Sequence, residues 1–329
     1  MTVPADTVRA TPATWLAGCI PDLPTPFDQP GAIDLAALAA LCQRQIEAGV
    51  AAIVVCETAG EASTLTSAEQ ERIIRAAVAA ARGRIRIIAG AGSNSTSQAI
   101  ELTRRAEAAG ADAILSVVPY YNKPTQAGIE AHFAAIAAAT KLPVILHDIP
   151  SRTMRALSDD TLARLAESRQ FIGLIDGTGE IARLSRLRRQ LPDGFRLLCG
   201  DDTTALAFVA SGGDGCISTV CNVAPDLSRV MLLSCSQGRL QTARHLQSRL
   251  APLTAALADE SPAALKYALS LLGLMRPDTR LPIVELTDAA KGEVARAVAE
   301  VGHEGLAGSD ERRPDPCLHH GGGRRVAES

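Results

Sequence analysis

Polar side chains that could do chemistry stand at the ends of short apolar runs. Glu57 and Thr58 follow the second such run, and His147 ends the fifth. An imidazole titrates near neutral pH, so His147 could serve as an acid or a base. The guanidinium of Arg152, five residues further on, has the planar donor geometry that suits a carboxylate. These residue types are the ones that acid–base chemistry on a small carboxylic acid would use.

Short runs rich in branched residues alternate with Ala/Leu/Arg-rich helical runs. Eight such repeats predict an α/β fold, a closed (β/α)8 TIM barrel rather than an open sheet. We expect helix N-caps at Asp34 and Ser67, and helix ends at Gly49 and Gly110. The expected strands are 17–23, 51–56, 85–89, 113–118, 144–147, 171–175, 196–199 and 215–218, and the clearest helices are 35–48, 67–81, 97–109 and 129–140.

The chain is expected to divide into four segments. A flexible N-terminus (1–14) precedes the barrel (15–235), and a C-terminal helical extension (236–302) follows it. The extension has three helical patterns, at 241–257, 262–272 and 287–301. The last segment, 303–329, is polar and rich in Gly and Pro, which predicts a disordered tail.

Catalytic residues of such barrels lie at the C-terminal ends of the strands. The stretches expected there read CETAGEASTL from Cys56, PYYNKPTQAG from Pro119, LHDIPSRT from Leu146, CGDD from Cys199 and GGDGCISTVCNVAP from Gly212. In this order they resemble the dihydrodipicolinate synthase/N-acetylneuraminate lyase family. PYYNKP and IPSRT are most similar to its 4-hydroxy-tetrahydrodipicolinate synthase branch. The resemblance extends over residues 15–301.

The resemblance implies a proton relay that includes Thr58 and Tyr121. In the family this Tyr reaches into the site of a neighbouring subunit, which implies a homodimer or homotetramer. The third relay member of the family is a Tyr, and His147 stands in its place here. The relay would then work with a different pH profile, because an imidazole and a phenol titrate in different ranges.

The resemblance also implies a ligand, a small 2-oxo acid or another carboxylate. Arg152 matches the carboxylate-binding Arg of the family, and Gly60 and Ile217 match backbone positions around pyruvate. Ala59 stands where the family has a second Thr, so one hydroxyl contact to the pyruvate carboxylate is lost.

The largest departure lies in FIGLIDGTGE, residues 171–180. The family has a Lys there that forms a Schiff base with pyruvate, and Ile175 occupies its position. An amine converts a ketone into an iminium electron sink, and isoleucine cannot. The four lysines of the chain fall outside the inward-facing strand ends, so Schiff-base chemistry is not expected. They are Lys123, Lys141, Lys266 and Lys291.

The expected mouth of the barrel is more acidic than in the family, because Asp22, Glu57 and Asp148 replace uncharged residues. Asp22, Glu57 and His147 are weak candidates for holding a divalent metal or a cationic ligand. Carboxylates at a barrel rim more commonly turn outward to a helix N-terminus or an Arg. We therefore expect no metal and no other cofactor.

Three functions remain open at this point. One is an aldolase- or lyase-type enzyme that acts on a 2-oxo acid without a Schiff base, through His147 or a metal. Another is 4-hydroxy-tetrahydrodipicolinate synthase, which condenses pyruvate with aspartate semialdehyde. The third is a non-catalytic paralogue that binds a carboxylate.

Composition excludes several other classes. The net charge is −3 and the charges are interspersed, which argues against a nucleic-acid partner. No apolar run approaches the roughly 18 residues that span a bilayer, and no apolar leader is present, so we expect a cytoplasmic protein. The eight cysteines form no CxxC pair, and we interpret them as small buried hydrophobes.

Overall fold

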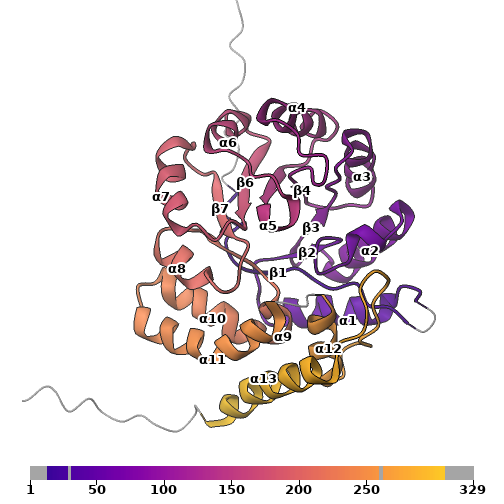
Figure 1. Cartoon of the computed structure of the whole chain (residues 1–329), viewed down its shortest axis with the longest axis vertical. Coiled ribbons are helices and arrows are strands. Elements are labelled where there is room, and N and C mark those ends of the chain that lie inside the picture. The colour runs from indigo at the N-terminus through magenta and orange to yellow at the C-terminus, as the bar shows by residue number, and fades with distance from the viewer. Residues whose placement is uncertain (1–12, 29–30, 259–261, 308–329) are drawn as a thin grey trace, which may run out of the picture.

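The computed structural model describes residues 13–28, 31–258 and 262–307, and in them eight parallel strands form one barrel (Figure 1). The sheet order is β1-β8-β7-β6-β5-β4-β3-β2, and a bridge between Asp22 and Val54 joins β1 to β2. The predicted barrel is confirmed. The strands are β1 Gly18–Pro21, β2 Ala52–Val55, β3 Arg86–Gly90, β4 Ala113–Val117, β5 Val144–Asp148, β6 Phe171–Asp176, β7 Arg196–Cys199 and β8 Gly215–Ser218.

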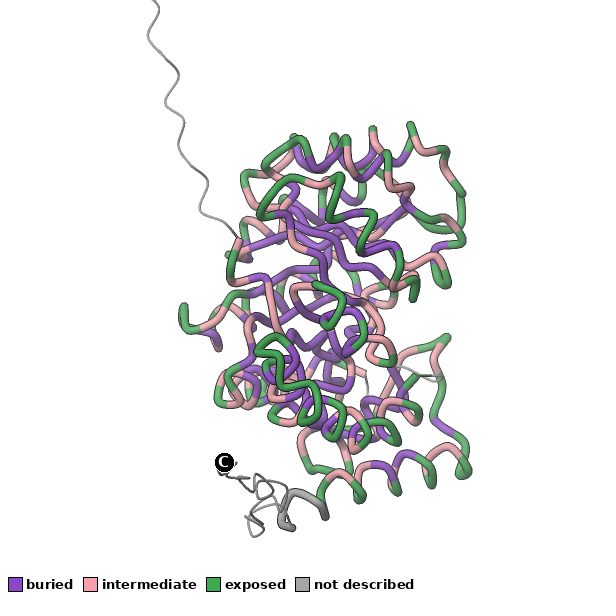
Figure 2. The backbone as a smooth tube through the Cα atoms, turned by 90° about the vertical axis from the view of Figure 1, so that its left-hand side faces the viewer, coloured by how far each residue is buried: buried purple, intermediate pink, exposed green. Residues whose placement is uncertain are grey.

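Two hydrophobic cores follow from the alternation of side chains along each strand. The inner core fills the barrel, and the outer core lies between the strands and the surrounding helices, so the strands are buried on both sides (Figure 2). A strand buried on both faces reads as a continuous apolar run, as these do. The inner core comprises Leu16, Ile20, Ala52, Val54, Ile88, Ala113, Leu115, Ile145, Ile175 and Leu198.

The helices begin and end close to the predicted residues. Asp34 caps α1 by accepting hydrogen bonds from two backbone N–H groups. The N-cap expected at Ser67 is wrong, because Thr66 caps α2 in a reciprocal capping box with Glu69. Gly49 follows α1 with a φ of 72°, which favours glycine. The barrel helices are α1 Leu35–Glu47, α2 Ser67–Ala81, α3 Thr96–Ala108, α4 Gln126–Ala137, α5 Pro150–Thr153, α6 Asp159–Ala166, α7 Ile181–Gln190 and α8 Ala205–Ala210, with a 3-10 turn η1 at Ala62–Thr64.

Helices after β8 form the C-terminal extension, which lies along one side of the barrel (Figure 1). Lys266 of α12 is fully buried and forms an ion pair with Glu61, so it ties this extension to the β2–α2 loop. α13 continues five residues beyond the boundary expected at 302, and the expected tail from 308 onward lies outside the described residues. The elements are α9 Val220–Val223, α10 Pro225–Ser236, α11 Leu240–Ala258, α12 Ala263–Leu271 and α13 Asp288–Ala307.

Seven of the eight cysteines lie in the described ranges, and all seven are buried and free. This confirms their interpretation as small buried hydrophobes, while Cys317 lies outside the described residues. None of the helices that the structure describes is both long and apolar enough to cross a membrane.

Candidate active site

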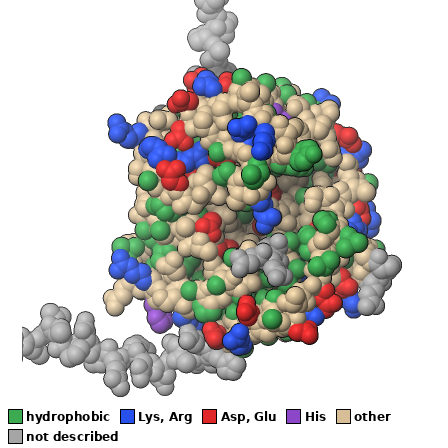
Figure 3. Space-filling model, viewed as in Figure 1, with side chains coloured by type: hydrophobic (Ala, Val, Ile, Leu, Met, Phe, Trp, Pro, Cys, Tyr) green, Lys and Arg blue, Asp and Glu red, His purple; other side chains and the backbone are tan. Residues whose placement is uncertain are grey.

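A cavity of about 350 Å³ opens where the strands end, and Figure 3 shows the molecule hollowed near its centre. The loops after β1, β2, β5, β6, β7 and β8 line it, and these are the loops that carry chemistry in a barrel of this kind. Its polar and charged lining residues are Asp22, Glu57, Thr58, His147, Ser151, Arg152, Thr178, Asp201, Asp202, Thr203, Thr219 and Thr254.

Glu57 and His147 form a carboxylate–imidazole pair inside this cavity. His147 Nδ1 lies 3.0 Å from Glu57 Oε1, and both side chains are about nine-tenths buried. The second oxygen of Glu57 accepts the backbone N–H of Thr58. A carboxylate accepts only, so Nδ1 of His147 must donate, and Nε2 is left to accept or release a proton.

Glu57 remains ionised across the physiological range. Burial acts to raise the pKa of its carboxyl, but the charge of His147, its hydrogen bond and the hydrogen bonds from Thr58 lower that pKa to about 2. Glu57 therefore fixes the orientation of the imidazole through its hydrogen bond to Nδ1.

This pair predicts a specific pH dependence of stability. A depressed carboxyl pKa stabilises the folded state above the unfolded pKa of about 4.5, and that contribution disappears as the pH falls toward about 2. We expect Glu57→Gln to lose about 3 kcal/mol of this pH-dependent stability. Urea unfolding at pH 7 and pH 3 measures about 2 kcal/mol of it, because the folded-state carboxyl is still mostly ionised at pH 3. Glu167→Gln, at an exposed position, should show the same change in the free energy of unfolding between pH 7 and pH 3 as the wild type. If Glu57→Gln shows that same change too, the account is contradicted.

Asp22 faces the same cavity from the end of β1 and is 6% exposed. Its Oδ2 accepts the backbone N–H of Ala59 at 2.8 Å, and its Oδ1 has no hydrogen-bond partner in the described residues. Asp22 and Glu57 therefore do not turn outward, and that expectation is wrong. No three His, Cys, Asp or Glu side chains in the described ranges are grouped as metal ligands would be.

Arg152 is the only Lys or Arg among the described lining residues. It stands on the short helix α5 directly after β5, and its side chain has no ion pair or hydrogen bond within the described part of the chain. An unpaired guanidinium at the edge of an acidic cavity can hold a carboxylate with two parallel hydrogen bonds.

Ile175 lies on the floor of the cavity, in register between His147 of β5 and Leu198 of β7. It is 1% exposed and belongs to the inner core of the barrel. All four lysines of the chain lie in the described part, and none of them lines the cavity.

The remaining predicted residues are distributed around the cavity. Thr58, Ala59 and Ile217 line it, whereas Gly60 lies behind Ala59 and accepts the hydroxyl of Thr25 at 2.7 Å. Tyr121 does not line it, and is 88% exposed with a φ of 69°. Because the side chain of Tyr121 is this exposed, it is free to contact another copy of the chain.

Two lining features were not expected from sequence. Thr178 closes the loop after β6, where its hydroxyl donates to Asp176 at 2.5 Å. Asp202 accepts the backbone N–H groups of Thr219 and Val220, which fixes the loop after β8. The strand-end position of each is visible in the sequence, but its hydrogen-bond partner is not.

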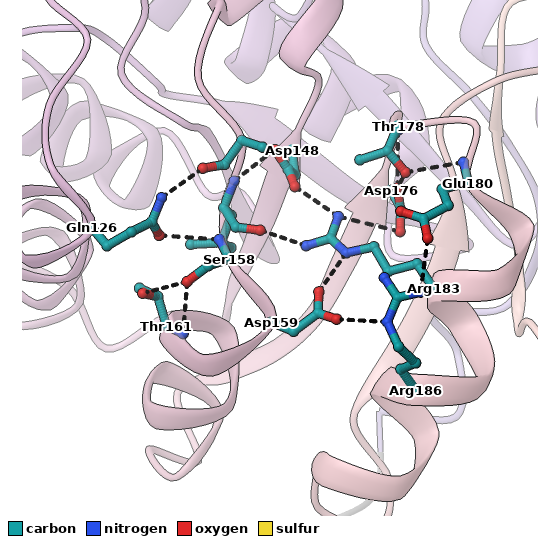
Figure 4. A network of polar contacts seen from close by, with 12 residues as sticks. Gln126, Asp148, Ser158, Asp159, Thr161, Asp176, Thr178, Glu180, Arg183 and Arg186 are labelled. Carbon is teal, nitrogen blue, oxygen red and sulfur yellow. Dashed lines mark hydrogen bonds and ion pairs between the residues drawn. The ribbon is translucent and has the colours of Figure 1, made fainter.

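Asp148 is not part of the acidic mouth, so that expectation is wrong. The carboxylate is fully buried and contacts Arg183 at 2.7 Å (Figure 4). Arg183 also lies 2.8 Å from Asp159 and 3.4 Å from Asp176, and it donates to the carbonyl of Leu157. This buried network holds the ends of β5 and β6 together behind His147 and Ile175.

Fold and site together define an aldolase-type (β/α)8 barrel with its cavity at the C-terminal ends of the strands. Residues 15–301 match the model of the dihydrodipicolinate synthetase family. The chain belongs to this family of lyases.

Named relatives are similar over nearly their whole length. The 4-hydroxy-tetrahydrodipicolinate synthase of Hyphomonas neptunium is 48% identical over 288 residues, 87% of this chain and 98% of the relative. That of Thiobacillus denitrificans is 46% identical over 281 residues, 85% of this chain and 95% of the relative.

Solved structures agree with the fold. The dihydrodipicolinate synthase of Acinetobacter baumannii, crystallised with pyruvate, has a TM-score of 0.85 at 39% identity, covering 87% of this chain and 99% of that one. The enzyme of Aquifex aeolicus has a TM-score of 0.85 at 36% identity, with 87% and 98% covered.

Proposed function

We propose that this chain is a lyase that binds a small 2-oxo acid and acts on it by acid–base chemistry without a Schiff base. The observation that carries the proposal is Ile175. It occupies the cavity floor beside His147, where the family resemblance implies the reactive Lys, and no other lysine lines the cavity. Without an amine no iminium can form, so the electrons of a carbanion must be accommodated on the keto oxygen itself.

The polar groups of the cavity fit this chemistry. Arg152 would bind the carboxylate of the ligand, and Thr58 and the backbone near Ile217 would line its other side. His147 would remove a proton from C3 through Nε2, because Glu57 holds Nδ1 as a donor. This placement does not require Tyr121 of the same chain.

A second part of the proposal is that the chain forms a homodimer or homotetramer, and Tyr121 supports this assembly. We propose the cytoplasm as its location. Its exposure leaves the phenol free to enter the cavity of a neighbouring copy, as the family resemblance implies. Such a copy would place a second proton donor near His147.

The synthase reaction on pyruvate and aspartate semialdehyde is the second candidate. The names of the relatives favour it, since each of those reported above is a 4-hydroxy-tetrahydrodipicolinate synthase. Against it stands the chemistry of Ile175, which cannot supply the iminium that the family mechanism uses.

Ligand binding tests the proposed site. Pyruvate should bind in calorimetry, and Arg152→Met should weaken its binding by about 10- to 150-fold, since a hydrogen bond to a charged group contributes roughly 1.5–3 kcal/mol. Arg155→Met is the matched control, because Arg155 lies in the same loop but does not line the cavity. Equal affinities of the two variants, or no binding of any 2-oxo acid by the wild type, would refute the assignment.

A further inference from the structure

We propose that Asp22 is a neutral carboxylic acid whose O–H donates a hydrogen bond to the keto oxygen of the bound 2-oxo acid. This inference rests on the proposed function and names the group that would replace the missing iminium as the stabiliser of negative charge. It is drawn from the hydrogen bonds, burial and charged neighbours of Asp22.

The backbone of Asp22 is held rigidly at the cavity wall. Its N–H donates to the carbonyl of Ser218 at 3.2 Å, and its own carbonyl accepts Nδ2 of Asn222 at 2.7 Å. Asp22 is only 6% exposed, and it lines the cavity. A side chain fixed in this way presents its carboxyl group to the ligand with little loss of conformational freedom.

The two carboxyl oxygens of Asp22 have unequal surroundings. Oδ2 accepts the N–H of Ala59, and Oδ1 is buried with no partner in the described residues. A neutral acid fits this pattern, because its carbonyl oxygen accepts and its hydroxyl still has a proton to donate.

Asp202, in the loop after β7, shows what a fully hydrogen-bonded carboxyl group looks like in this cavity. Its oxygens accept three donors, the hydroxyl of Ser218 and the N–H groups of Thr219 and Val220. An ionised Asp22 would have one donor for two charged oxygens, and buried charges are normally paired or fully hydrogen-bonded.

The charged and titratable neighbours of Asp22 favour the neutral form. Burial raises its pKa well above the usual range, and the negative charge of Glu57 raises it further. The N–H of Ala59 and the guanidinium of Arg152 oppose this rise. The thiol of Cys56 also lies nearby, and burial raises its pKa, so it adds no negative charge beside Asp22. Glu57 is held as an anion by His147, so Asp22 is the group that retains the proton.

A neutral donor at Asp22 completes the proposed chemistry. His147 Nε2 takes the proton from C3 of the oxo acid, the C–H electron pair forms the C2–C3 double bond, and the C2–O electron pair moves onto oxygen. The O–H of Asp22 then strengthens its hydrogen bond to that oxygen. A carboxylic acid kept neutral by its environment is a known way to stabilise an enolate. A neutral Asp22 also reduces charge repulsion, because the anionic ligand then faces only the carboxylate of Glu57 and not two carboxylates.

Difference infrared spectroscopy tests the protonation state. The spectrum of the wild type minus that of Asp22→Asn at pH 7 should show the carbonyl stretch of an un-ionised carboxyl group, shifted in D₂O. Saturating pyruvate should move this band, because the donor then has a partner. A missing band at pH 7, or a band that does not move when calorimetry shows pyruvate bound, would overturn the proposal.

Exchange of the C3 protons of pyruvate for deuterium, followed by NMR, tests the donor role. Asn retains an N–H donor, so Asp22→Asn should keep most of the exchange rate, whereas Asp22→Ala should lose about 10²-fold. Equal rates in the two variants would overturn the donor role. If the wild type binds no pyruvate and catalyses no exchange, the proposed function itself fails. The proposed donor role of Asp22 is then refuted as well, and the infrared band shows only that Asp22 is protonated.

Discussion

Replacing Arg183 with methionine should destabilise the folded chain by about 3–5 kcal/mol. The guanidinium is buried among Asp148, Asp159 and Asp176, and Asp148 is itself fully buried. Removing the cation leaves buried carboxylates without a partner, which is among the largest penalties that one substitution produces. Urea unfolding at a fixed protein concentration measures the change.

A neighbouring residue provides the control for this prediction. Arg186 stands on the same helix and pairs with Asp159 and Glu180, but its side chain is 49% exposed. Arg186→Met should therefore change stability by less than about 1 kcal/mol. Adding Asp148→Asn to Arg183→Met should recover part of the loss. Similar effects of the two single Arg variants would show that the network contributes no more than a surface ion pair.

Replacing His147 with asparagine should slow deuterium exchange at C3 of pyruvate by about 10²- to 10⁴-fold, the usual contribution of a general base. The amide keeps a polar side chain on β5 but cannot accept the C3 proton at neutral pH. His132→Asn is the matched control, because His132 is also buried but contacts Thr96 on the outer helices. An unchanged rate in the His147 variant would remove it from the proposed reaction.

The arrangement of strands and helices could be predicted from sequence because it depends on local patterns. Strands buried on both sides read as short branched runs, and Gly49 marks a helix end by its own conformation. The N-cap predicted at Ser67 lies one residue too late, for an equally local reason. Thr66 and Glu69 form a capping box, which sequence alone leaves in competition with the adjacent serine.

The partners within the site could not be predicted, because they come from distant parts of the chain. Asp148 pairs with Arg183, which is 35 residues away, and Glu57 pairs with His147, which is 90 residues away. Sequence places each residue at a strand end, but only the closed barrel decides which strand ends face one another. Sequence alone therefore predicts that Asp148 adds negative charge to the mouth, whereas in the structure Asp148 is buried and pairs with Arg183.

Reductive trapping tests the central claim most directly. The chain is incubated with pyruvate and borohydride, and its intact mass is measured beside that of the Hyphomonas neptunium relative as a positive control. Reduction of a Schiff base leaves the pyruvate carbon skeleton covalently attached to a lysine. We predict that the mass of this chain stays unchanged while the relative gains the adduct. An adduct on this chain would contradict the account and make the synthase reaction the leading candidate.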